Sequence, residues 1–363
     1  MRREQIANRQ FTFILLIMRT TVVIATLPVL TTGDALQDAW ISALVTTLLT
    51  GVLVTIMAAL GSRFPEDSVV DYAEKLLGKW LGKAVALVVL WAYLHLAAIS
   101  IRWYAEMIVT GFLPETPLLF VIGSMVIVAA YAAYEGLEVV GRIADVFLFI
   151  MMTAILTSLV AAAPEMRMAN LEPVLARGLA PPLMATIIPV AVGAELMVIG
   201  MLVPSLVQPE KAVVSALWAV ALSGLILTSV AVLVIGVLSA ESASETVFPF
   251  LRMLRAIQVT EFIDRVEVLI IFAWSLGVFV GFSTFIYSGA RGLADFLGRD
   301  DYRFLIAPMG IHWVFLGHHL FGDMYQVREF WQPQFMGVYG LSLVLVPYGV
   351  LWLAYLVRKG MTA

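Results

Sequence analysis

Apolar residues occur in long runs along this chain, without the alternating pattern of half-buried strands. We identify ten runs at about residues 10–32, 39–61, 84–112, 117–134, 143–163, 183–205, 211–238, 264–289, 303–321 and 337–357. Because about 20 apolar residues span a bilayer as a helix, the pattern predicts an all-α polytopic membrane protein with ten transmembrane helices. The run at 303–321 is the weakest, because it is short and contains His312, His318 and His319.

The composition agrees with a membrane protein and excludes several other classes. Of 363 residues, 61% are hydrophobic and 13% are charged, and the mean hydropathy is +0.96. A water-soluble enzyme or nucleic-acid-binding domain cannot bury that much apolar surface. The chain has no cysteine, and its 4 histidines form no cluster with acidic residues. Since we also find no nucleophile–base pair or phosphate-binding loop, we expect no enzyme activity, no metal, no cofactor and no nucleic-acid partner.

The positions of lysine and arginine predict the orientation. If the N-terminus is cytoplasmic, the loops on that side hold more than twice as many lysines and arginines as the loops on the other side. Positive residues favour the cytoplasmic side. We therefore expect an integral membrane protein with both termini in the cytoplasm.

Two segments between spans have the pattern of amphipathic surface helices. Residues 68–80 place apolar side chains at helical spacing, and Ser68 and Asp71 have the spacing of a capping box. We expect this helix on the cytoplasmic surface. Residues 246–258 carry an apolar stripe formed by Phe248, Leu251, Leu254 and Ile257. The second stripe predicts an external helix, which either covers a vestibule or simply lies on the surface.

The ten spans of this single transmembrane domain (1–363) divide into two sets of five, at 10–163 and 183–357. Since five is odd, the two halves would insert with opposite topology, which makes an inverted repeat. Spans 1 and 6 are then counterparts, and span 6 is the most interrupted run in the chain, with Pro189, Gly193 and Pro204. The alternatives are broken helices that expose backbone groups to a ligand or helices that are merely kinked.

A few charged residues fall within the apolar runs, where an unpaired charge costs several kcal/mol. Glu195 lies near the middle of span 6. It either binds an amine, carries a proton, hydrogen-bonds to unwound backbone or pairs structurally with Arg19 or Arg102. Arg102 and Glu106 are four residues apart, which favours an ion pair. Arg265 and Glu267 open span 8 at its outer edge, where charges cost little.

From these patterns we select two sets of candidate residues. The ligand-binding candidates in spans 1, 6 and 8 are Thr20, Thr21, Thr26, Gly193, Ala194, Glu195 and Ser275. The ion-pair or gating candidates are Arg19, Arg102, Glu106, Arg265 and Glu267. Gly277 and Gly281 are four apart in span 8, which favours close helix packing but also suits the wall of a ligand cavity.

Several stretches, in their order and spacing, carry a resemblance to a known family. They are TLP and LTTGDALQDAWIS, FPEDSVVDYAEKLLGKWLGK, IRWYAEM, LEPVLARGLAPP, GAELMVIGMLVPSL, EFIDRVEVLIIFAW and YSGARGLADFLG. From about residue 10 to the C-terminus, the chain resembles the B subunit of spore germinant receptors, the GerAB-type proteins of the amino acid–polyamine–organocation transporter superfamily.

The resemblance implies a fold, a site and partners. The fold has two inverted five-helix repeats with discontinuous first and sixth helices, like LeuT, and the site lies near the bilayer midplane where spans 1, 3, 6 and 8 meet. Such proteins are taken to sense small nutrients, often amino acids, in the spore inner membrane, together with an A subunit and a lipoprotein C subunit. The matching positions are Arg102, Glu106, Gly193, Glu195 and the run at 264–267.

One stretch departs from the superfamily pattern. Where relatives carry a glycine-rich break in helix 1, this chain has Thr21, Val22 and Val23. Glycine eases unwinding, whereas valine is stiff. This departure argues against binding of a ligand carboxylate by the backbone of span 1. It leaves open a ligand other than a standard α-amino acid, or a role in assembly.

We therefore carry three functional hypotheses. The first is a germinant-receptor subunit that binds a small, amino-acid-like molecule. The second is a proton- or sodium-coupled permease for amino acids or organic cations, with Glu195 as the coupling acid. The third is a scaffold subunit that binds no ligand.

Overall fold

The helices of a computed structural model follow the predicted runs closely. The structure describes residues 4–24, 35–246, 248–256 and 266–362. The long helices are α1 (Asn8–Ile24), α3 (Ala39–Gly61), α5 (Lys79–Gly111), α6 (Leu118–Glu135), α7 (Leu137–Ala162), α11 (Ala212–Leu238), α14 (Val266–Phe296), α15 (Arg303–His319) and α17 (Val338–Thr362). The short helices are α4 (Val69–Leu77), α8 (Ala180–Met184), α9 (Ile187–Val192), α10 (Ile199–Leu202), α12 (Ala240–Ser244), α13 (Pro249–Ala256) and α16 (Met324–Phe330).

The prediction of an all-helical membrane protein is confirmed, while the count of ten spans stays a prediction. Within the described residues, 8 helices are long and apolar enough to cross a membrane. The remaining two predicted spans correspond to α1 and α15, whose described parts have 17 residues each. Each of the ten predicted runs thus coincides with a long helix or, for span 6, with a series of short ones.

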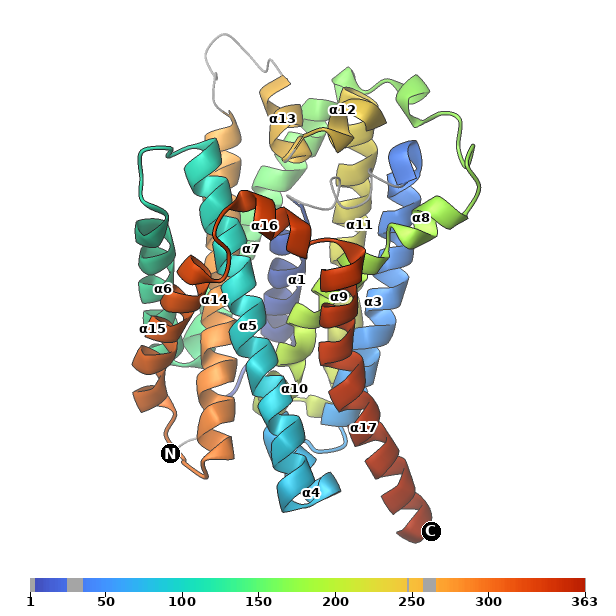
Figure 1. Cartoon of the computed structure of the whole chain (residues 1–363). Coiled ribbons are helices and arrows are strands. Elements are labelled where there is room, and N and C mark those ends of the chain that lie inside the picture. The colour runs from blue at the N-terminus through green and yellow to red at the C-terminus, as the bar shows by residue number, and fades with distance from the viewer. Residues whose placement is uncertain (1–3, 25–34, 247, 257–265, 363) are drawn as a thin grey trace.

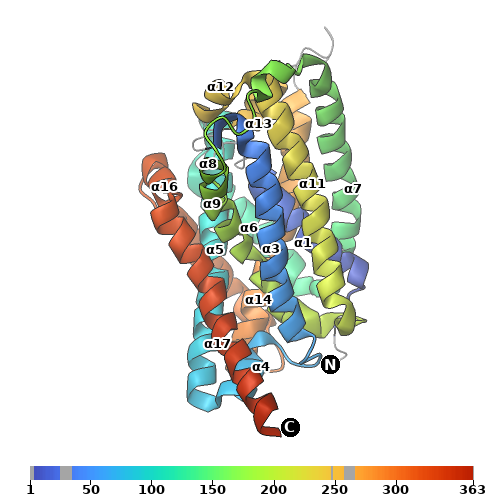
Figure 2. The same cartoon turned by 90° about the vertical axis from the view of Figure 1, so that its right-hand side faces the viewer.

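The helices form one bundle with the interrupted span at its centre. Figures 1 and 2 show α1, α9 and α10 inside the bundle, with both termini and α4 at one end and α12 and α13 at the other. In the interrupted span, Ala180–Ser205, 94% of the most apolar stretch is buried, compared with 33% for the spans containing α7 and α17. The outer helices therefore face lipid with much of their surface, and the interrupted span faces protein.

Span 6 is broken where its proline and glycine residues predicted a break. After α9 the chain forms a 3₁₀ turn, η4 (Gly193–Val198), and then the four-residue α10 and a second 3₁₀ turn, η5 (Val203–Ser205). Proline has no N–H to donate, so Pro189 and Pro204 each remove a helical hydrogen bond. By contrast, α1 is continuous from Asn8 to Ile24 and includes Val22 and Val23. The predicted break in span 1, including Thr26, otherwise falls on residues outside the described part.

The two predicted surface helices are present as α4 and α13. The capping box that begins α4 is formed, since Ser68 Oγ accepts from the Asp71 N–H at 3.4 Å and the Asp71 carboxylate accepts from the Ser68 N–H at 3.1 Å. In α13, Leu251 and Leu254 are buried. Of the predicted stripe, Ile257 lies outside the described residues.

A buried arginine joins α5 to the end of α15. The Arg102 guanidinium donates to Glu106 Oε1 at 2.8 Å and to the backbone carbonyls of His318 at 2.8 Å and Phe321 at 2.6 Å. The last carbonyls of a helix have no partner within the helix, and a cation there also interacts favourably with the helix dipole. We name this arrangement of Arg102, Glu106 and the α15 end the arginine clamp.

The first prediction concerns the close approach of α5 to α4 at Gly82. A Cβ atom at Gly82 would lie 2.7 Å from the Ala73 carbonyl oxygen and from the Glu74 nitrogen, which are backbone atoms and cannot turn aside. We expect Gly82→Ala to destabilise the protein by about 1–3 kcal/mol, measured as a lower Tm in detergent. Gly123→Ala is the matched control, because no atom lies within 4 Å of its added Cβ. Equal Tm values for the two variants would contradict this packing.

The second prediction concerns the arginine clamp. Arg102→Met leaves the buried Glu106 carboxylate and the α15 carbonyls without their donor, and breaking a buried pair typically costs about 3–5 kcal/mol. We expect a large fall in Tm in detergent. The double variant Arg102→Met/Glu106→Leu should recover part of that loss, because no unpaired charge remains buried. A double variant no more stable than the single one would show that the loss of stability comes mainly from the lost carbonyl contacts and not from the unpaired buried charge of Glu106.

Candidate ligand-binding site

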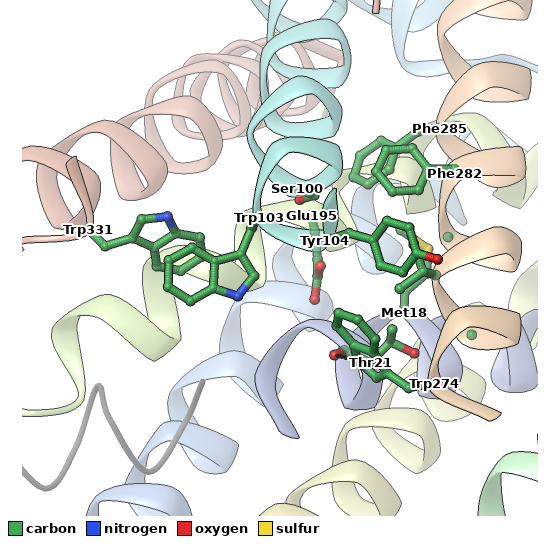
Figure 3. Close-up of a pocket in the computed structure, with 13 residues that line it drawn as sticks. Met18, Thr21, Ser100, Trp103, Tyr104, Glu195, Trp274, Phe282, Phe285 and Trp331 are labelled. Carbon is green, nitrogen blue, oxygen red and sulfur yellow. Dashed lines mark hydrogen bonds between the residues drawn. The ribbon is translucent and has the colours of Figure 1, made fainter. Parts of the chain in front are cut away.

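A pocket lies where α1, α5, the broken span 6 and α14 meet. It is lined by Met18, Thr21, Ser100, Trp103, Tyr104, Glu195, Trp274, Gly277, Val278, Gly281, Phe282, Phe285 and Trp331. Figure 3 shows the Glu195 side chain in the middle of this group, between Trp103 and Tyr104. The cavity is about 30 Å³, which is room for about two water molecules. The described conformation is therefore nearly closed, and any larger ligand requires side chains to move.

Glu195 is the only acidic residue in the lining, and its carboxylate has no hydrogen-bond partner among the described residues. The side chain comes from the 3₁₀ turn η4 and is 3% exposed, and neither Oε1 nor Oε2 is hydrogen-bonded. Buried polar groups are nearly always hydrogen-bonded, and an exception calls for a physical explanation. A carboxylate with two free oxygens, held at a pocket, can accept hydrogen bonds from a ligand.

Arg19 lies near Glu195 but does not line the pocket. Its Nη2 donates to the Pro189 carbonyl at 3.0 Å and to Thr50 Oγ1 at 3.3 Å, while its Nη1 has no hydrogen-bond partner. The two side chains attract each other electrostatically, but no hydrogen bond joins them. Arg102, the other arginine considered as a partner of Glu195, is engaged in the arginine clamp instead. The structural pairing that we considered for Glu195 is thus only a loose one with Arg19.

Aromatic rings form most of the remaining wall. The rings of Trp103 and Trp331 lie 5.1 Å apart, and those of Tyr104 and Trp274 lie 5.3 Å apart. Trp274 donates its indole N–H to the Thr21 carbonyl at 2.5 Å, which ties α14 to α1. The indole N–H groups of Trp103 and Trp331 have no partner. The wall therefore offers ring faces and two free donors, and the centre offers one carboxylate.

The predicted ligand-binding residues divide into three groups. Thr21 and Glu195 line the pocket. Ser275 lies beside the pocket, where its Oγ accepts a hydrogen bond from the Tyr104 hydroxyl at 3.2 Å. Thr20, Gly193 and Ala194 are buried next to these residues but do not line the pocket.

The remaining predicted residues lie elsewhere. Arg102 and Glu106 form the arginine clamp, and Arg19 is a buried neighbour of Glu195 that does not line the pocket. Thr26 and Arg265 lie outside the described residues, and Glu267 belongs to α14 with a side chain that the structure does not describe. In the part of the chain that is described, no group of three or more histidine, aspartate or glutamate side chains could hold a metal ion.

Sequence reasoning missed the aromatic wall, although a signal for it was present. Trp274, Val278, Gly281 and Phe285 follow one another at the spacing of a single helix face. This stripe includes Gly281, which suited a cavity wall as well as close packing. Trp103 and Tyr104 stand one and two residues after Arg102, in a stretch that drew attention only for its charges. Trp331 could not be found this way, because it follows a short helix outside the predicted spans.

Comparison with known proteins identifies relatives and structural neighbours. The sequence profile of the family described as "Spore germination protein" matches residues 5–319. Among relatives in Bacillus subtilis (strain 168), spore germination protein KB is 28% identical over 76% of this chain and 75% of its own length. Spore germination protein YndE is 26% identical over 80% of this chain and 81% of its own length, and spore germination protein A2 is 24% identical over 92% and 91%.

Two solved structures share the fold at low sequence identity. The crystal structure of MhsT in complex with L-phenylalanine matches with a TM-score of 0.68 at 14% identity, over 98% of both chains. A Na⁺-coupled sialic acid symporter in a substrate-bound outward-open state matches with a TM-score of 0.65 at 9% identity, over 94% of this chain and 79% of the symporter. These likenesses establish the LeuT fold, and the profile match over most of the sequence establishes that this chain belongs to the spore germination protein family.

Proposed function

We propose that this chain is the membrane subunit of a germinant receptor and that it binds a small nutrient molecule in the pocket around Glu195. Its family membership supports a role in germination. The single observation that supports binding is the buried Glu195 carboxylate, which faces the pocket with both oxygens free. A ligand that donates to these oxygens satisfies a group that is otherwise costly to bury.

Binding would change the conformation because the pocket is nearly closed. A cavity of about 30 Å³ must widen to admit a nutrient, and its walls belong to α1, α5, η4 and α14. A ligand shifts the population toward the conformation in which it binds better. We propose that the two repeats, 10–163 and 183–357, move relative to each other in this change. The change would pass to A-type and C-type receptor subunits in the spore inner membrane, with both termini of this chain in the cytoplasm.

A permease is the second candidate, and one observation favours it. At the end of the bundle that holds the termini and α4 (Figure 1), a cavity of about 760 Å³ is lined by residues including Glu4, Asp71 and Asp295. A wide vestibule on one side and a closed pocket further in are what alternating access requires. The scaffold remains the third candidate, and it would show no stabilisation by any nutrient.

We expect a nutrient ligand to stabilise the purified chain in a way that depends on Glu195. The probes are common amino acids, nucleosides, sugars and simple amines, tested by thermal shift in detergent. A ligand at about 100 times its Kd should add about 2.7 kcal/mol to the stability. Glu195→Gln should lose this shift and keep its ligand-free Tm. Glu241→Gln, an exposed carboxyl in α12, is the matched control and should behave as wild type.

Other results of these measurements would favour a different role for Glu195 or a different function for the chain. A Glu195→Gln variant with a lower ligand-free Tm would make the residue a structural partner of Arg19. Unchanged ligand response and unchanged Tm would contradict both roles. Uptake of the bound nutrient into liposomes would favour the permease over the sensor, and a complete absence of binding would favour the scaffold.

A further inference from the structure

The lining of the pocket carries an acidic side chain but no basic one. The lining contains one carboxyl group, from Glu195, and no lysine, arginine or histidine. The other polar side chains of the lining are neutral: the hydroxyls of Thr21, Ser100 and Tyr104 and the indole N–H groups of Trp103, Trp274 and Trp331. Of these indole groups, those of Trp103 and Trp331 have no partner among the described residues. The pocket therefore offers a cationic group a charged partner and offers an anionic group none.

We propose that the pocket recognises its ligand through a primary ammonium group carried on a small apolar body, and that the ligand needs no carboxylate. The proposal rests on the proposed function, because it names the chemical class that would occupy the same pocket. A simple alkylamine or arylalkylamine has this chemistry, and an α-amino acid has it only with an additional negative charge.

The first argument is the partner that Glu195 offers. An ammonium group has three donors and no acceptor, and two of them would satisfy the two free oxygens of Glu195. Arg19 makes no hydrogen bond to these oxygens and does not line the pocket, and its Nη2 donates instead to the Pro189 carbonyl and to Thr50 Oγ1. The carboxylate would then lie between two cations.

The second argument is the aromatic wall. Six of the lining side chains are aromatic: Trp103, Tyr104, Trp274, Phe282, Phe285 and Trp331. The negative face of an aromatic ring attracts a cation, most strongly where water is excluded. Arg19 and Glu195 already balance each other in charge, so an ammonium group adds one net positive charge to the site. The ring faces would stabilise this added charge. They also bury the apolar body of the ligand.

The third argument concerns the carboxylate of an amino acid. Attached to the same carbon as the ammonium group, it would lie close to the Glu195 carboxylate and be repelled by it. The backbone of α1 does not offer free N–H groups beside the pocket, because the helix runs without a break through Thr21 to Ile24. The free indole N–H groups are neutral donors and suit a hydroxyl or carbonyl oxygen better than a buried anion.

The experiment compares four probes with one shared body. The full chain in detergent is titrated with isoamylamine, L-leucine, isocaproate and isoamyl alcohol, and the apparent Kd is obtained from the rise in Tm. The four probes carry an ammonium group alone, both charged groups, a carboxylate alone and a neutral hydroxyl. We expect isoamylamine to bind at least about tenfold more tightly than each of the others, where a tenfold ratio corresponds to about 1.4 kcal/mol.

Two variants connect the binding to this pocket. Glu195→Gln keeps the shape of the side chain and removes its charge, so it should weaken isoamylamine at least about tenfold, while Glu241→Gln should not. If Glu195→Gln does not fold, Trp331→Leu serves instead. It removes one ring face from the wall and should weaken isoamylamine more than isoamyl alcohol.

The possible results separate this proposal from the proposed function. L-leucine binding as tightly as isoamylamine, or isoamyl alcohol doing so, would overturn the ammonium proposal and leave a ligand-binding subunit intact. Isoamylamine binding that survives both Glu195→Gln and Trp331→Leu would place the amine elsewhere and also overturn it. If neither these four probes nor any nutrient binds, both the ammonium proposal and the proposed function are wrong.

Discussion

The backbone of the sixth span places the main constraint on this fold. Inside a bilayer every backbone N–H and carbonyl must find a partner within the protein, so irregular backbone is tolerated only where protein surrounds it. The turn from Gly193 to Val198 is such a stretch, and it is packed by α1, α3, α5, α14 and α17. The same irregular turn carries Glu195, so the arrangement that shields the backbone also encloses an acidic side chain.

Within the residues that the structure describes, two buried arginines lie near a buried glutamate, and only one of the two pairs is joined by hydrogen bonds. In the arginine clamp, Arg102 contacts Glu106 and the carbonyls at the end of α15, so the donors and acceptors match. Around Glu195 the donors and acceptors do not match. Arg19 donates to the Pro189 carbonyl and to Thr50 Oγ1, and both oxygens of the Glu195 carboxylate have no hydrogen bond. A complete pair stabilises a structure, whereas an incomplete one is a place for a further group to bind.

Glu195, the acidic member of the incomplete pair with Arg19, lies where several helices meet, so a ligand bound there would contact all of them. Segments far apart in the sequence, from α1 to Trp331, contribute to one small cavity, and the Trp274 indole already joins α14 to α1 there. Packed helices change between discrete arrangements and do not deform continuously. A ligand larger than the present cavity must move side chains of several segments at once, which can favour a different arrangement of those segments.

The amino-acid sequence alone determined the class of this protein, the positions of its helices and the place where one of them breaks. These follow from local properties, because apolar length, proline and glycine act within a few residues of themselves. The sequence also singled out Glu195, because a charged residue in an apolar run is costly, and the structure places it in the lining of a pocket together with Thr21. Only the tertiary structure decided which charges pair, because Arg102 could meet either Glu106 or Glu195, and the choice depends on how α5 lies against α15 and η4. It likewise decided that Trp103, Trp274 and Trp331 form one wall, because aromatic residues in a membrane chain serve equally well at the lipid interface, and only packing between distant segments brings them together.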